Sequence, residues 1–96
     1  MKILAMEREM PGIQPDQFAQ HLKAEALRVW DLYSSGALRE IYFTRDRSEA
    51  VLMLECTDEH EAARLLDTLP LVQAGLIRFD IFPLFPYTGF ARLFSE

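Results

Sequence analysis

Residues 15–36 read PDQFAQHLKAEALRVWDLYSSG, and this stretch predicts a long amphipathic helix. Pro15 and Asp16 are typical of a helix start, with Asp16 as the N-cap, and Gly36 is typical of a helix end. At about 100° per residue, apolar side chains gather on roughly one third of the helix surface. The positions on this apolar face are Phe18, Leu22, Val29, Leu32 and Tyr33.

One acidic residue interrupts that face. Glu25 falls in its middle, and His21, four residues earlier, is its neighbour on the helix surface. A carboxylate is seldom buried unless it is paired or has a function. We therefore predict Glu25 as a catalytic acid–base group, with His21 orienting it or relaying its proton. The alternative is a structural ion pair between Glu25 and Arg28, Arg39 or Arg78.

The rest of the chain predicts four strands and one further helix. The strands cover residues 2–9, 37–45, 50–56 and 76–84, and the second helix starts at Thr57 or Asp58 and ends at Pro70. In the second strand we expect Ile41 and Phe43 on one face and Leu38, Glu40 and Tyr42 on the other. The order strand, helix, strand, strand, helix, strand predicts a single α+β domain over residues 1–96. We expect a ferredoxin-like, four-stranded antiparallel sheet with two helices on one face.

Two further features predict a partner subunit. The strands carry apolar residues on both faces, and two helices can cover only one, so a second copy is expected to cover the other. The tail, residues 85–96, contains Phe85, Tyr87, Phe90 and Phe94, too much apolar surface to stand in water. We expect the tail to lie against the body or across a partner subunit.

Composition excludes several classes of function. The net charge is −5 and the basic residues are scattered, which argues against nucleic-acid binding. No apolar run approaches the roughly 18 residues of a membrane span. A lone cysteine, Cys56, fits a reducing compartment, so we expect a cytoplasmic protein. His21 and His60 show no metal-ligand spacing, and the sequence has no glycine-rich phosphate loop, so neither a metal nor a cofactor is expected.

Several short strings resemble the muconolactone isomerase-like branch of the dimeric α+β barrel proteins. They are LKAE at 22–25, Gly36, LPL at 69–71, FDI at 79–81 and the proline-containing tail. The resemblance implies a small cytoplasmic homodimer, in some members a larger assembly, that holds a small molecule between helices and sheet. It also implies that an acidic residue of the first helix moves a proton, and Glu25 lies at or within one residue of that position.

The predicted cavity is lined by Phe18, His21, Leu22, Glu25 and Tyr33. Tyr33 and Tyr42 are candidates to bind a substrate carbonyl, and Arg39 is a candidate to bind a carboxylate. For each of the three, an ordinary structural or surface role is the alternative.

The predicted function is a cofactor-free isomerase that transfers a proton on a small lactone or unsaturated ring acid. Two alternatives stay open: a small-molecule-binding or assembly protein without catalysis, and a cofactor-free oxygenase of the same fold.

Overall fold

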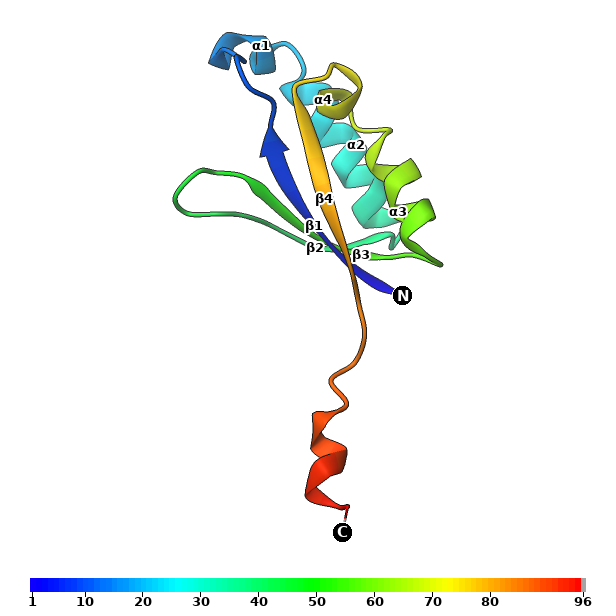
Figure 1. The fold of residues 1–96 in the computed structure, drawn as a ribbon. Helices are drawn as coiled ribbons and strands as arrows, with labels where there is room; N and C mark the ends of the chain where they lie inside the picture. The colour runs from blue at the N-terminus through cyan, green and yellow to red at the C-terminus, as the bar shows by residue number, and fades with distance from the viewer. Residues whose placement is uncertain (96) are drawn as a thin grey trace.

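The computed structural model describes residues 1–95 and has the architecture expected from the sequence (Figure 1). The elements are β1 (Lys2–Glu9), α1 (Pro15–Ala19), α2 (Leu22–Ser34), β2 (Leu38–Phe43), β3 (Ala50–Glu55), α3 (Glu59–Leu66), α4 (Pro70–Gln73), β4 (Ile77–Leu84) and a 3₁₀ helix, η1 (Gly89–Leu93). The strands pair antiparallel in the order β2-β3-β1-β4, and the helices lie on one face of the sheet. This confirms the ferredoxin-like α+β fold.

The long helix expected at residues 15–36 is interrupted, and this corrects the prediction. The short helix α1 ends in a tight turn in which the His21 N–H donates to the carbonyl of Phe18 at 2.9 Å. The interruption lets Phe18 pack against a small cluster of Leu71, Leu76 and Ile77, while α2 packs on the sheet. The N-cap also differs from the prediction by two positions: it is Gln14 rather than Asp16.

Two local features explain why the helix begins at Pro15, as predicted, with Gln14 rather than Asp16 as its N-cap. Pro15 occupies the first helical position, where its missing N–H leaves no bond unmade and its fixed φ suits the helix. The N–H of Gln14 is satisfied by the side chain of Gln17, whose Oε1 lies 2.7 Å away. The predicted helix end is confirmed, since Gly36 follows α2 with a φ of 89°, a value that favours glycine.

A β-bulge changes which face of β2 carries Leu38. Ile41 and Phe43 lie on the helix-covered face, as expected from alternation. The pairing with β3 shifts between Leu38 and Glu40, so Leu38 also points into the core and is 1% exposed. The prediction placed Leu38 with Tyr42 on the opposite face because strict alternation cannot include an extra residue.

The second predicted helix is also two elements. Asp58 caps α3, accepting the N–H of Glu61 at 2.8 Å, which agrees with one of the two predicted starts. The helix ends at Leu66, and Pro70 opens α4 instead of closing α3. Proline is common at the first position of a helix, so Pro70 can begin α4 as readily as it could end the preceding helix.

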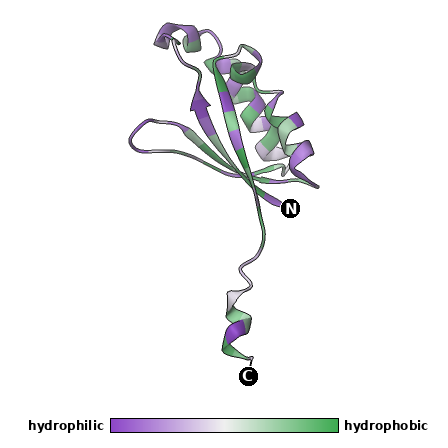
Figure 2. Cartoon of the chain, viewed as in Figure 1, coloured by the Kyte–Doolittle hydropathy of each residue, from purple (hydrophilic) through white to green (hydrophobic). Residues whose placement is uncertain are grey.

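The core lies between the sheet and the helices. Its fully buried side chains come from three strands and the segment before α4: Ile3, Leu38, Leu52, Leu54 and Leu69. Figure 2 shows apolar residues concentrated along the strands and polar residues in the connection between β2 and β3. Within residues 1–95, no helix has the length and apolar character needed to cross a membrane.

The C-terminal arm, residues 85–95, extends away from the body (Figure 1). The radius of gyration is 15.9 Å, against about 13 Å for a compact chain of this length. Leu84 pairs with Lys2 near the start of β1, so no neighbouring strand lies beyond it to support the arm. Phe85 and Phe94 are 82% and 85% exposed. The expectation that the tail packs against its own body is therefore wrong.

Candidate functional site

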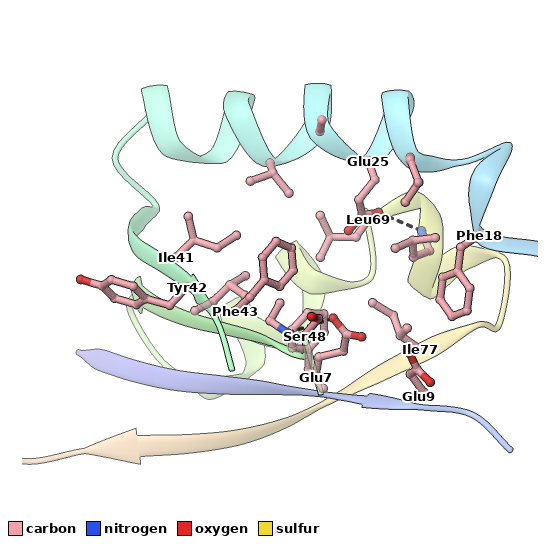
Figure 3. A pocket seen from close by; sticks show the side chains of 17 residues that line it. Glu7, Glu9, Phe18, Glu25, Ile41, Tyr42, Phe43, Ser48, Leu69 and Ile77 are labelled. Carbon is pink, nitrogen blue, oxygen red and sulfur yellow. Dashed lines mark hydrogen bonds between the residues drawn. The ribbon is translucent and has the colours of Figure 1, made fainter. Parts of the chain in front are cut away.

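A cavity of about 670 Å³ lies between α2 and the sheet (Figure 3). Three carboxylates line it, together with Ser48 and Tyr42. The other lining residues are apolar: Phe18, Leu22, Ala26, Val29, Ile41, Phe43, Ala50, Leu52, Leu69, Leu71, Ile77 and Phe79. Exposure of Leu22 (52%) and Phe43 (71%) shows that the cavity is open to solvent on one side. Its volume suits a small ring compound.

The first carboxylate belongs to Glu25, which is half-buried on α2. Its Oε1 accepts a hydrogen bond from the backbone N–H of Leu71, 2.9 Å away, in the first turn of α4. Figure 3 shows this bond at the wall of the cavity. Glu25 thus joins α2 to the start of a helix, where a negative charge is favourable.

Glu25 does not form the ion pair that was the alternative prediction. Arg28 donates to the hydroxyl of Thr68 at 2.8 Å, and Arg39 donates to the carbonyl of Gly36 at 2.7 Å. Arg78 pairs with the neighbouring Asp80. None of the salt bridges in the described part of the chain includes Glu25.

The surroundings of Glu25 favour its protonated form. Burial raises the pKa of Glu25 above its usual value, while the Leu71 N–H and the nearby His21 act in the opposite direction. A carboxylate with a raised pKa is a stronger base and holds a proton at higher pH, as required of a group that takes up and returns a proton.

The second carboxylate, Glu7, was not predicted as a site residue. It lies on β1 and is only 8% exposed, and its Oε1 accepts the backbone N–H of Ala50 at 3.0 Å. Ile3, Ala5 and Glu7 share one face of the strand, and all three are buried. Strict alternation along residues 2–9 is the signal that could have identified it, because Glu7 has the parity of the buried residues.

Glu7 also has a raised pKa. Burial raises the pKa of Glu7, the Ala50 N–H opposes this, and the charges of Glu9, Glu49 and Glu25 raise it further. In the described residues, no buried side-chain oxygen or nitrogen lacks a hydrogen-bond partner. Since each carboxylate uses Oε1 for its backbone bond, the second oxygen of Glu7 and of Glu25 is therefore accessible. Figure 3 shows the two groups on opposite walls of the cavity.

The third carboxylate, Glu9, is exposed near the end of β1. The neighbouring cation, Arg8, points to the other side of the sheet. Its guanidinium lies 3.2 Å from Asp80 and 3.8 Å from Glu49, so it does not neutralise the carboxylates of the cavity. No Lys, Arg or His side chain lines the cavity in the part of the molecule that the structure describes.

The structure brings four of the predicted site residues to the cavity: Phe18, Leu22, Glu25 and Tyr42. The ring of Tyr42 points away from the cavity, and its hydroxyl donates to Glu40 Oε1 at 2.8 Å (Figure 3). It is not placed to bind a substrate carbonyl.

The other three predicted residues, His21, Tyr33 and Arg39, do not line the cavity. His21 lies at the turn before α2, near enough for its charge to influence Glu25. Tyr33 is 50% exposed and packs against Trp30, with ring centroids 5.8 Å apart. Arg39 is held at the bulge by its bond to Gly36. In residues 1–95, no group of three His, Cys, Asp or Glu side chains is arranged to hold a metal ion.

Comparison with known proteins identifies the fold. No known protein family matches the sequence, and no curated protein matches it either. Among solved structures, the chain resembles 5-chloro-2-hydroxyhydroquinone dehydrochlorinase (TftG) from Burkholderia phenoliruptrix AC1100, in complex with 2,5-dihydroxybenzoquinone. The TM-score is 0.73 over 93% of this chain and 98% of the other, at 15% sequence identity. The two chains share a fold. At this identity the likeness establishes the architecture and leaves the activity to the residues of the cavity.

Proposed function

We propose that this protein is a small cofactor-free enzyme of the muconolactone isomerase-like type, which transfers a proton on a lactone or an unsaturated ring compound. The observation that carries the proposal is the half-buried carboxylate of Glu25, with a raised pKa, at the wall of a largely apolar cavity. Proton transfer next to a carbonyl requires a positioned base, and Glu25 is the candidate for that base.

In this reaction the free oxygen of Glu25 takes a proton from a carbon next to the substrate carbonyl. The C–H electron pair forms a new C=C bond and the carbonyl becomes an enolate. The same carboxyl group then returns the proton at the far end of the conjugated system, so the double bond moves and no atom is gained or lost. Phe18 and Leu22 contact the ring. His21 lies outside the cavity, and its charge lowers the pKa of Glu25.

The structural neighbour supports small-molecule chemistry in this fold. That neighbour is a dehydrochlorinase of a chlorinated hydroxyhydroquinone, and it holds 2,5-dihydroxybenzoquinone. We extend to this chain only the general type: a small ring compound that loses a proton.

Hydrogen–deuterium exchange tests the proposal without knowledge of the true substrate. Unsaturated lactones and cyclic enones are incubated with the protein in D₂O, and loss of the proton next to the carbonyl is followed by NMR. We expect Glu25→Gln to slow the exchange by about a hundredfold or more, as for removal of a general base. Glu59→Gln, an equal charge change at an exposed position of α3, is the control. Exchange at the wild-type rate in Glu25→Gln would contradict the proposal.

A second candidate function is a binding protein without catalysis, and one observation favours it. The bond from Leu71 to Glu25 gives this carboxylate a structural role in joining α2 to α4. In that case ligands bind in the cavity but show no exchange in the wild-type protein. An oxygenase is distinguished from both by product formation that depends on dissolved oxygen.

We also propose that the functional unit is a homodimer in which two sheets pack face to face. The face of the sheet opposite the helices carries Leu4, Met6, Val51 and Met53, which are only half-buried. Phe82 adds a 43% exposed aromatic ring to this face. The exposed aromatic arm, residues 85–95, is then available to lie across the second copy.

A further inference from the structure

The charges that line the cavity restrict what it can bind. Glu7 and Glu25 face it from opposite walls, Glu9 lies at its edge, and the described part of the lining contains no cation. A bound carboxylate would meet carboxylates on both sides without a guanidinium or ammonium group to pair with. Burying an unpaired charge is costly in an apolar cavity, and a nearby like charge adds to the cost.

The two carboxylates can instead accept hydrogen bonds. Each uses one oxygen for a backbone N–H, Glu7 for Ala50 and Glu25 for Leu71, and these bonds fix the side chains. The second oxygen of each is free to accept a hydroxyl of a ligand. Between them, Val29, Leu52 and Phe79 provide apolar surface for a ring.

From this arrangement we propose that the cavity binds a neutral ring compound carrying two or more hydroxyl groups and no carboxylate, with one hydroxyl donating to Glu7 and another to Glu25. This rests on the proposed function and deepens it, because it makes Glu7 a residue that determines specificity. On this proposal, the unsaturated ring acid expected from the sequence is not a substrate.

A cationic ligand is the less favourable alternative. An ammonium group could pair with the free oxygen of one carboxylate, but Glu7 and Glu25 lie on opposite walls, so a single cationic centre does not engage both acceptors as two hydroxyl groups on one ring do. Whether ionised or protonated, each carboxyl group keeps an oxygen that can form a hydrogen bond, since a carboxylic acid both donates and accepts. A hydroxylated ring therefore suits the site in either protonation state.

The test compares matched ligands by isothermal titration calorimetry. Hydroquinone carries two opposed hydroxyl groups, 1,4-dimethoxybenzene has the same shape without donors, and 4-hydroxybenzoate replaces one hydroxyl with a carboxylate. 4-(Aminomethyl)phenol supplies the cation. We expect hydroquinone to bind about ten- to a hundredfold more tightly than 1,4-dimethoxybenzene, as the loss of hydrogen bonds to charged groups predicts. Saturable binding of 4-hydroxybenzoate is expected to be absent.

Glu7→Gln then tests the residue itself. Its amide oxygen still accepts the Ala50 N–H, so the fold is kept, while an NH₂ group replaces the free oxygen toward the cavity. We expect weaker binding of hydroquinone and measurable binding of 4-hydroxybenzoate, whereas Glu59→Gln changes neither.

Three results would overturn the proposal: no saturable binding of hydroquinone, tighter binding of the cation, or a wild-type protein that binds 4-hydroxybenzoate as well as hydroquinone. These are equilibrium measurements, so they are independent of proton exchange. Selective binding of hydroquinone without proton exchange would contradict the proposed catalysis and support the proposed ligand class. Proton exchange on a ligand that carries a carboxylate would support the catalysis and contradict the ligand class.

Discussion

Replacing Glu25 by alanine separates the structural role of this residue from its chemical role. The Leu71 N–H that it accepts belongs to a residue that is 8% exposed, so alanine leaves a nearly buried donor without its partner. An unsatisfied buried group costs about 1–3 kcal/mol, which for a domain of this size lowers the melting temperature by about 4–24 °C. The lower value applies if water from the cavity reaches the N–H. Glutamine keeps an acceptor, so Glu25→Gln is expected to unfold close to the wild type.

Urea denaturation followed by circular dichroism measures both variants. Amide hydrogen exchange at Leu71 adds a local probe, since its protection should fall in Glu25→Ala and persist in Glu25→Gln. If Glu25→Ala is as stable as the wild type, or if both variants lose the same stability, the hydrogen bond from Leu71 to Glu25 does not stabilise the fold.

Three other predictions concern the core, the pH dependence and the arm. Leu52→Ala, at a position 1% exposed, is expected to lower the free energy of unfolding by about 2–5 kcal/mol in urea titrations. Because the pKa of Glu7 is raised by burial and by Glu9, Glu49 and Glu25, the folded protein holds this proton more tightly than the unfolded chain. The free energy of unfolding therefore falls as pH rises from the usual glutamate pKa through the raised one. Glu7→Gln is expected to flatten the plot of melting temperature against pH over this range. A plot with the same slope as that of the wild type would contradict the raised pKa of Glu7. Finally, a chain ending at Leu84 is expected to sediment as a monomer or a weaker dimer than the full chain, and equal association of the two would exclude a role for the arm.

The architecture followed from the sequence because each strand and helix carries its own periodic signal. The bounds of β1 agree with residues 2–9, and Ile77, Phe79 and Ile81 of β4 have the predicted alternation. The two interrupted helices and the bulge in β2 depend instead on tertiary contacts. Phe18 leaves the axis of α2 to join a cluster formed partly by Leu71, some fifty positions later in the chain, and no local pattern contains that information.

Tertiary contacts also explain why two of the predicted site residues do not line the cavity. Tyr33 lies at the edge of the apolar face of the helix, and its exposure is decided by how α2 rotates on the sheet and by its contact with Trp30. Arg39 was expected to reach a ligand, but the bulge at Leu38 displaces it and Gly36 accepts its Nε–H. A side chain at the edge of a face cannot be assigned to a cavity until the neighbouring elements are placed.

Glu25 and Glu7 obey a single rule, applied at two different periods. Glu25 was recognised because a charge interrupted an apolar face at the helical period, and Glu7 interrupts the buried side of β1 at a period of two in the same way. The consequence is chemical as well as structural. Glu25 alone would be compatible with an acidic substrate bound by a nearby arginine, as the sequence suggested. With Glu7 on the facing wall and Arg39 held elsewhere, the phase of a helix and the register of a strand together give the cavity two opposed acceptors, and this pairing selects a ligand that donates hydrogen bonds.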